Sequence, residues 1–104
     1  MIAASDLHTY QFRFLTVTSA GLADLLGAAS ANCVGVLQNK PTAGQSCSIM
    51  AVGISVVVSG AAVNPGPVAS DSVGRAVAAG SDPTLGWALE AAAAANIQIP
   101  VLLR

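Results

Sequence analysis

The side chains that could perform acid–base or nucleophilic chemistry are few and scattered. Asp6 and His8 are two residues apart, so an extended segment would place a carboxylate and a general base on the same side. No activated nucleophile accompanies them, because no serine lies in the G-x-S-x-G pattern of a nucleophile elbow. We therefore interpret Asp6 and His8 as a polar pair near a chain end, and we expect a protein that is not an enzyme.

The residue types also predict no metal and no cofactor. The carboxylates occur singly along the chain, at Asp6, Asp24, Asp71, Asp82 and Glu90. No close pair of them shares an element, which argues against a glycosidase pair or a calcium site. Cys33 and Cys47 lack the surrounding histidine or cysteine cluster of a zinc site. We expect free, buried thiols; the alternative is a disulfide, which requires the two segments to lie side by side.

Composition and charge exclude several function classes. The 104 residues include four Lys or Arg, five Asp or Glu and one His, which gives a formal net charge of −1. The cations are Arg13, Lys40, Arg75 and Arg104. Four scattered cations cannot form the basic stripe that binds nucleic acid or a membrane surface. Because only 9% of the residues are charged, we expect partners or further copies of the chain to cover part of the surface.

The sequence predicts neither disorder nor a targeting or membrane-spanning segment. Hydrophobic residues make up 54% of the chain, which excludes a disordered protein. The most apolar stretch, residues 49–63, is too short and too interrupted by Gly and Ser to span a bilayer as a helix. The first residues lack the basic-then-apolar layout of a signal peptide, so we expect synthesis and folding in the cytoplasm.

Short apolar or alternating runs separated by turn formers predict a domain that is all-β or mainly β. The expected strands are residues 10–18, 33–37, 46–59, 68–70, 75–78, 84–90 and 97–103. Gly53 makes residues 46–59 either one kinked strand or two short ones, and residues 22–29 fit a short helix or a strand. Asp71 and Gly74 have the spacing of a turn. The predicted architecture is a small compact β-barrel or β-sandwich-like domain with at most short helical turns.

Two features near the C-terminus affect the expected sheet order. Pro100 lies in the last predicted strand and has no N–H, so we expect that strand at an edge, at least on that side. Residues 91–95 are all alanine, the strongest helix former. Because an isolated helix this short is marginal, we predict a strand followed by a turn, with one helical turn as the alternative.

The N-terminus is the predicted partner contact. Residues 1–9 show no regular period, so we expect a flexible, extended arm before a single domain of residues 10–104. An extended arm can add a strand to another chain's sheet, whereas plain terminal disorder is the alternative. Deleting the arm should then weaken partner binding while the body stays folded. The candidate residues for contact with a partner or with a further subunit are Ile2, Leu7, Tyr10, Phe12, Arg75, Trp87 and Glu90.

Trp87 and the charged candidates each have two interpretations. Alternation places Trp87 on one face with Leu85 and Leu89, which fits core packing; the alternative is an interface anchor, a role in which Trp is enriched. Arg75 and Glu90 could pair across strands or subunits, although solvated charges are the simpler interpretation.

From residue 33 onward the chain contains a series of short motifs in a defined order. They are GVLQNKP at residues 35–41, SDSVGRAV at 70–77, LGWALEAA at 85–92 and IPVLL at 99–103. In order and spacing, this series resembles a family of small tailed-phage capsid decoration proteins, also called cement proteins. Asn96 stands where that family more often has Gly, and Asn tolerates the same backbone region.

The resemblance implies a small β-rich structural protein without catalysis. Such proteins bind the outer surface of an assembled head in several copies and reinforce the shell. The implied partners are the major capsid protein and copies of the chain itself, as a trimer or another homo-oligomer on the virion after synthesis in the host. The residues alone leave two alternatives: a small β-barrel accessory or ligand-binding module of a cytosolic complex, and a subunit that assembles into a shell or fibre by itself.

Overall fold

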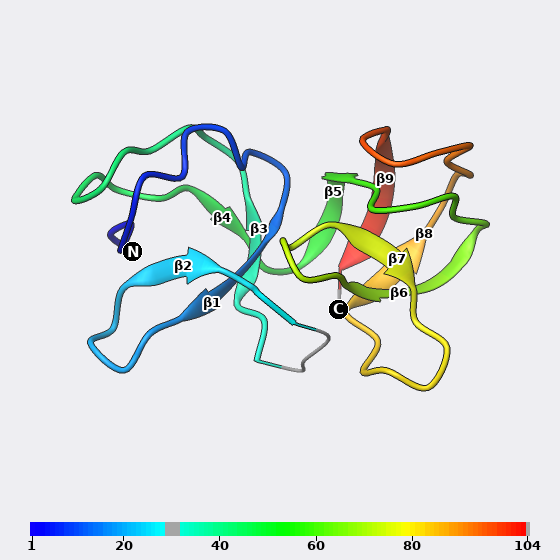
Figure 1. Cartoon of the computed structure of the whole chain (residues 1–104), viewed down its shortest axis with the longest axis horizontal. Coiled ribbons are helices and arrows are strands. Elements are labelled where there is room, and N and C mark those ends of the chain that lie inside the picture. Colours follow the sequence, from blue (N-terminus) through cyan, green and yellow to red (C-terminus); the bar gives the residue numbers. More distant parts are fainter. Residues whose placement is uncertain (29–31, 104) are drawn as a thin grey trace.

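The computed structural model describes residues 1–28 and 32–103, which form two β-sheets side by side (Figure 1). The four-stranded sheet has the order β2-β1-β3-β4 and consists of β1 (Phe14–Val17), β2 (Ala23–Leu25), β3 (Gly35–Leu37) and β4 (Ile49–Met50). The five-stranded sheet has the order β5-β9-β8-β6-β7 and consists of β5 (Gly53–Val58), β6 (Gly66–Ser70), β7 (Ala76–Ala78), β8 (Gly86–Ala88) and β9 (Gln98–Leu103). All paired strands are antiparallel.

The described residues contain no helix, which confirms the all-β prediction. Accordingly, none of them forms a helix long and apolar enough to cross a membrane. Residues 46–59 form two strands, since β4 ends at Met50 and β5 begins at Gly53, where φ is +112°. Of the predicted residues 22–29, Ala23–Leu25 form strand β2 and the other described ones form no helix; Ala29 lies outside the described residues. The strand predicted from residue 10 begins only at Phe14, because Phe12 has φ +65° and interrupts the extended backbone.

The main hydrophobic core lies between the two sheets. The first half of the chain contributes Phe14, Leu26 and Val36 to it. The second half contributes Val57, Val63, Val68, Ala76, Ala88, Ala92, Ile99, Val101 and Leu103. Hydrogen bonds cross the same junction: Val58 N–H donates to the Phe12 carbonyl (2.9 Å) and Phe14 N–H to the Gly74 carbonyl (2.8 Å). The two sheets therefore share one core.

The opposite face of the four-stranded sheet is covered by the N-terminal segment. Ile2 forms a bridge with Ser46 and Ala3 forms one with Ala23, so this segment lies between β2 and the stretch before β4. The side chain of Leu7 is only 1% exposed. The resulting second hydrophobic cluster contains Ala3, Leu7, Leu15, Ala23, Leu37 and Cys47. The segment is thus docked on its own sheet, which corrects the picture of a free arm with unpaired backbone. The division at residue 9 stays a prediction.

The five-stranded sheet curls toward a half-barrel. Just beyond β5, Ser59 bridges to Ala76 of β7, and the Gly60 N–H donates to the Ala76 carbonyl (2.8 Å). These contacts bring the two edge strands of the sheet together at one corner. An edge that reaches another strand of its own sheet has fewer free backbone groups for unwanted pairing.

Strand β9 lies inside its sheet, between β5 and β8, so the expectation of an edge position from Pro100 is wrong. The sheet tolerates this proline because β8 has already ended opposite it. The last paired residue of β8 is Ala88, and Leu89 N–H donates to the Pro100 carbonyl (3.0 Å). The N and O of one strand residue point to the same side, so the missing N–H faces the end of β8 and the ladder to β5 is not affected.

The alanine run forms neither a strand nor a helical turn. Ala92 makes a single bridge with Val63, and a turn follows at residues 95–96. The fully buried Ser59 fixes this loop, because its hydroxyl donates to the Ala94 carbonyl (2.7 Å) and accepts from the Ile97 N–H (3.1 Å). These tertiary hydrogen bonds outweigh the helix propensity of alanine. Asn96 has φ +63°, the left-handed conformation expected for a residue that replaces Gly there.

Candidate docking surface

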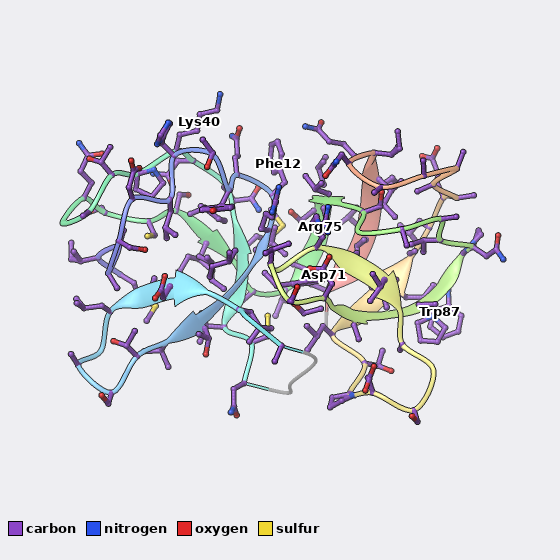
Figure 2. The ribbon with its side chains drawn as sticks, viewed as in Figure 1. Phe12, Lys40, Asp71, Arg75 and Trp87 are labelled. Carbon is purple, nitrogen blue, oxygen red and sulfur yellow. The ribbon has the colours of Figure 1, made fainter. Side chains whose placement is uncertain are left out.

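A row of apolar side chains crosses the outer face of the five-stranded sheet. Strand register pairs Ile54 with Leu102, Leu102 with Trp87, and Trp87 with Pro67. The side chains of Ile54 and Trp87 are 59% and 41% exposed. Figure 2 shows Trp87 on the side of this sheet away from the four-stranded sheet.

A second apolar row runs beside the first. Val56 pairs with Pro100, and Leu89 joins the end of the row through its hydrogen bond to Pro100. Val56 and Leu89 are both exposed. We call the two rows together the apolar face; its members are Ile54, Val56, Pro67, Trp87, Leu89, Pro100 and Leu102. None of them is charged.

The strands under the apolar face have the composition of strands buried on both sides. β5 reads GISVVV and β9 reads QIPVLL, so apolar residues occupy most inward and outward positions. Continuous apolar runs of this kind are typical of strands covered on both faces. The core covers only one face, on which Val57, Val101 and Leu103 are buried. The outer face is therefore a candidate docking surface, since each Å² of apolar surface removed from water contributes about 25 cal/mol.

Alternation around Trp87 identifies it as an outward residue. Its neighbours Gly86 and Ala88 are buried, whereas Trp87 itself is exposed. The core-packing interpretation is therefore wrong, because the inward positions of this short strand carry only small residues. The role of Trp87 as an interface anchor stays a prediction. Sequence reasoning missed Ile54, Val56 and Leu102, although the uniformly apolar runs of β5 and β9 were a signal for them.

The other candidate interface residues do not gather around Trp87. Ile2 and Leu7 lie in the docked N-terminal segment, where the buried Leu7 side chain is a core contact within the chain. Tyr10 packs against the same cluster, and its ring centroid lies 5.1 Å from Cζ of Arg13. Phe12 is half-buried at the junction of the two sheets.

The predicted turn at Asp71 and Gly74 is confirmed as the loop between β6 and β7. Asp71 Oδ1 accepts from the N–H groups of Val73 (2.9 Å) and Arg75 (2.8 Å). Its second oxygen, Oδ2, accepts from Arg75 Nε at 2.8 Å, and Arg75 Nη1 donates to Asn96 Oδ1 (3.2 Å). Arg75 is therefore paired with Asp71 and not with Glu90, which is exposed. This arrangement fixes the loop.

Asp6 and His8 form the predicted polar pair on the surface. His8 Nδ1 lies 2.7 Å from Asp6 Oδ1, and both side chains are 55% exposed. The hydrogen bond from His8 lowers the pKa of Asp6 below its ordinary value. No nucleophile is bonded to His8 in the part of the chain that the structure describes. Within that part, no group of three or more His, Cys, Asp or Glu is placed to hold a metal ion.

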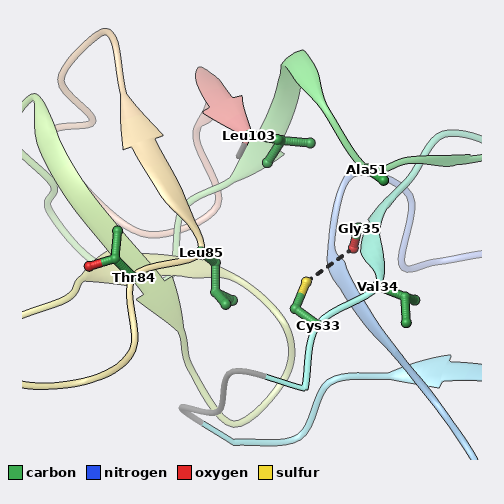
Figure 3. A pocket seen from close by; sticks show the side chains of 7 residues that line it. All are labelled: Cys33, Val34, Gly35, Ala51, Thr84, Leu85 and Leu103. Carbon is green, nitrogen blue, oxygen red and sulfur yellow. Dashed lines mark hydrogen bonds between the residues drawn. The ribbon is translucent and has the colours of Figure 1, made fainter.

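Cys33 lines a small pocket of about 220 Å³ near the end of β9 (Figure 3). The other lining residues are Val34, Gly35, Ala51, Thr84, Leu85 and Leu103. The Cys33 thiol donates to the Gly35 carbonyl (3.5 Å), and burial raises its pKa. A raised pKa keeps the thiol neutral and unreactive. Cys33 and Cys47 are both free, as expected from the sequence.

Comparison with known proteins finds a solved structure with a similar fold. No protein-family model matches the chain, and no curated protein matches it. Among solved structures it is similar to the crystal structure of the head fiber gp8.5 N base in bacteriophage phi29. The TM-score is 0.80 at 15% sequence identity, and the match covers 99% of this chain and 89% of that chain. The chain therefore has the fold of a phage head fiber base, which agrees with the phage-head resemblance of its motifs.

Proposed function

We propose that this chain is a non-enzymatic structural protein of a phage head, which binds the outer surface of the assembled capsid in multiple copies and stabilises it. The observation that carries the proposal is the apolar face, left open on a fold shared with a head fiber base. Soluble monomers rarely expose large contiguous apolar patches, and such patches mark docking sites. The chain has few charges to keep such a surface in water.

The stabilising mechanism is burial of the apolar face across neighbouring capsid subunits. Trp87 lies in the row between Leu102 and Pro67, a central position that suits an anchor. If the chain docks as a trimer or another homo-oligomer, several modest contacts act together and give tight attachment. A bound protein that spans subunits must be released before those subunits can separate, so it raises the resistance of the shell to internal pressure.

The first test measures the number of copies in the particle. Mass spectrometry of purified particles of the phage that encodes the chain should find it in a simple ratio to the major capsid protein. Absence from particles, with abundant soluble protein in the lysate, would contradict the proposal.

The second test asks whether the apolar face makes the contact. Ile54→Asp places a charge in the exposed row, and Val17→Asp places the same charge at a similarly exposed position (46%) on β1. Both variants should fold, which circular dichroism checks. In co-sedimentation with heads stripped of this protein, Ile54→Asp should bind at least about tenfold more weakly, since a buried unpaired charge costs several kcal/mol. Val17→Asp should bind like the unmodified chain; equal binding by both variants would remove the apolar face from the contact.

A further inference from the structure

A groove of about 400 Å³ crosses the junction of the two sheets, apart from the apolar face. It is lined by His8, Thr9, Gln11, Phe12, Arg13, Lys40, Val58 and Gln98. These residues come from the segment before β1, the loop after β3, the end of β5 and the start of β9. Figure 2 shows Phe12 and Lys40 along the same edge of the molecule.

Two of the four Lys or Arg of the chain, Arg13 and Lys40, line this groove. The single histidine, His8, lines it as well. His8 is held by Asp6 at 2.7 Å. Lys40 is exposed and makes no ion pair within the described part of the chain. The nearby carboxylate of Asp71 is bonded to Arg75. Among the residues that the structure describes, Arg13 and Lys40 therefore form no ion pair with a carboxylate.

Arg13 lies over the Tyr10 ring and is partly desolvated, and it forms no ion pair among the described residues. Its Nη1 donates to the Val73 carbonyl (3.2 Å), but its Nε is buried without a hydrogen-bond partner. Burial lowers the pKa of Arg13, although an arginine remains protonated in water. A buried donor and a partly desolvated positive charge both cost free energy unless an acceptor or a negative charge compensates them. A carboxylate in the groove would offset the cost of the desolvated positive charge.

We propose that this groove binds an acidic segment of a protein partner, with Asp or Glu carboxylates near Arg13 and Lys40. The remaining lining suits a peptide, because Gln11 and Gln98 can bond to its amides and Phe12 and Val58 can contact its apolar atoms. Nucleic acid is disfavoured, since phosphate backbones are bound by longer stripes of cations. The identification of the partner as a head protein rests on the proposed function. The acidic character of the bound segment does not depend on it.

A peptide titration tests the acidic chemistry directly. Hexaglutamate added to the ¹⁵N-labelled chain should shift the resonances of Lys40, Gln11 and Gln98 in a saturable, salt-sensitive way, and neutral hexaglutamine should not. Lys40→Glu should weaken hexaglutamate binding at least about tenfold. Ser81→Glu adds one negative charge at an exposed turn outside the groove, against a change of two in Lys40→Glu, and should leave binding close to that of the unmodified chain. Absent groove shifts, or equal shifts with hexaglutamine, would overturn the proposal.

Head binding by the same variants separates this proposal from the proposed function. If the unmodified chain binds stripped heads and Lys40→Glu weakens that binding while Ser81→Glu does not, both proposals are supported. If Lys40→Glu binds heads as well as Ser81→Glu does, the groove is not a head contact, and the identification of the partner as a head protein fails while the proposed function stands. If the unmodified chain binds hexaglutamate but not heads, the proposed function fails while the acidic site stands.

Discussion

At the scale of single residues, Gly74 shows how closely the two sheets approach. It closes the loop after β6 with φ +73°, and its N–H faces the Asp71 carbonyl at 3.5 Å. A Cβ atom built on Gly74 would lie 2.8 Å from the Phe14 carbonyl oxygen and 2.8 Å from Cδ1 of Leu25. Both neighbours belong to the four-stranded half, so the loop of one sheet touches the backbone of the other at this glycine.

Gly21 provides a matched comparison for the first prediction. It has φ +80° but nothing within 4 Å of a built Cβ. Gly21→Ala should therefore cost only the backbone strain, about 1–2 kcal/mol. Gly74→Ala should cost about 3 kcal/mol or more, because the backbone oxygen of Phe14 cannot move aside cheaply. Urea unfolding of both variants measures the difference, and equal losses would mean that the junction yields easily at this point.

The residue scale also shows what local patterns can and cannot predict. The spacing of Asp71 and Gly74 predicted their turn, because an Asp side chain bonds to the backbone two residues on. The left-handed backbone of Asn96 was expected for another reason, because the family that the motifs resemble more often has Gly there and Asn tolerates the same conformation. The partner of Arg75 did not follow from its spacing. An ion pair across strands requires the strand order, whereas the pair with Asp71 arises inside one loop.

At the scale of elements, the N-terminal segment acts as an extra strand of the first sheet. Ala4 N–H donates to the Ala23 carbonyl (2.7 Å), Ala23 N–H to the Ile2 carbonyl (2.8 Å) and Cys47 N–H to the Met1 carbonyl (2.6 Å). The segment thus satisfies backbone groups on both sides. Removing residues 1–9 would expose the second hydrophobic cluster, so the truncated body should lose stability. Because the truncated body is destabilised, a loss of partner binding after this truncation would not show that the segment itself contacts the partner.

Point variants separate the structural role of the segment from a contact role. Leu7→Ala removes a side chain that is 1% exposed and should lower the free energy of unfolding by about 3 kcal/mol. Ile2→Ala removes one that is 39% exposed and should cost about 1 kcal/mol or less. Thermal or urea unfolding followed by circular dichroism measures both. A small effect of Leu7→Ala would show that the segment leaves the sheet in solution, as the sequence alone suggested.

At the scale of the whole molecule, the two sheets form a single folding unit. The radius of gyration of 12.3 Å is that of a compact domain of this length, although the molecule measures 35 × 23 × 22 Å. Phe14 and Val36 of the first sheet pack with Val57 and Val101 of the second. Neither sheet can bury its inner face without the other, so neither half should be stable alone.

Two natural probes test this cooperativity. Trp87 is the single tryptophan and lies in the five-stranded sheet, while Cys47 is a buried thiol of the N-terminal cluster. In a Cys33→Ser variant, tryptophan fluorescence and the reactivity of the remaining thiol should show the same urea midpoint. Two separate midpoints would mean that the sheets unfold independently.

The sequence by itself determined the strand-rich class, the main turns, the free thiols and the resemblance to phage head proteins. Those features depend on local conformational preference and on the residues nearest in the chain. Only the tertiary structure decided that β9 is an inner strand despite Pro100, that the N-terminal segment docks on its own sheet, and that Trp87 points outward. The apolar face and the cationic groove likewise exist only after distant segments pair. Strand order and burial are properties of the whole chain, and no local pattern specifies which of two apolar faces the core will cover.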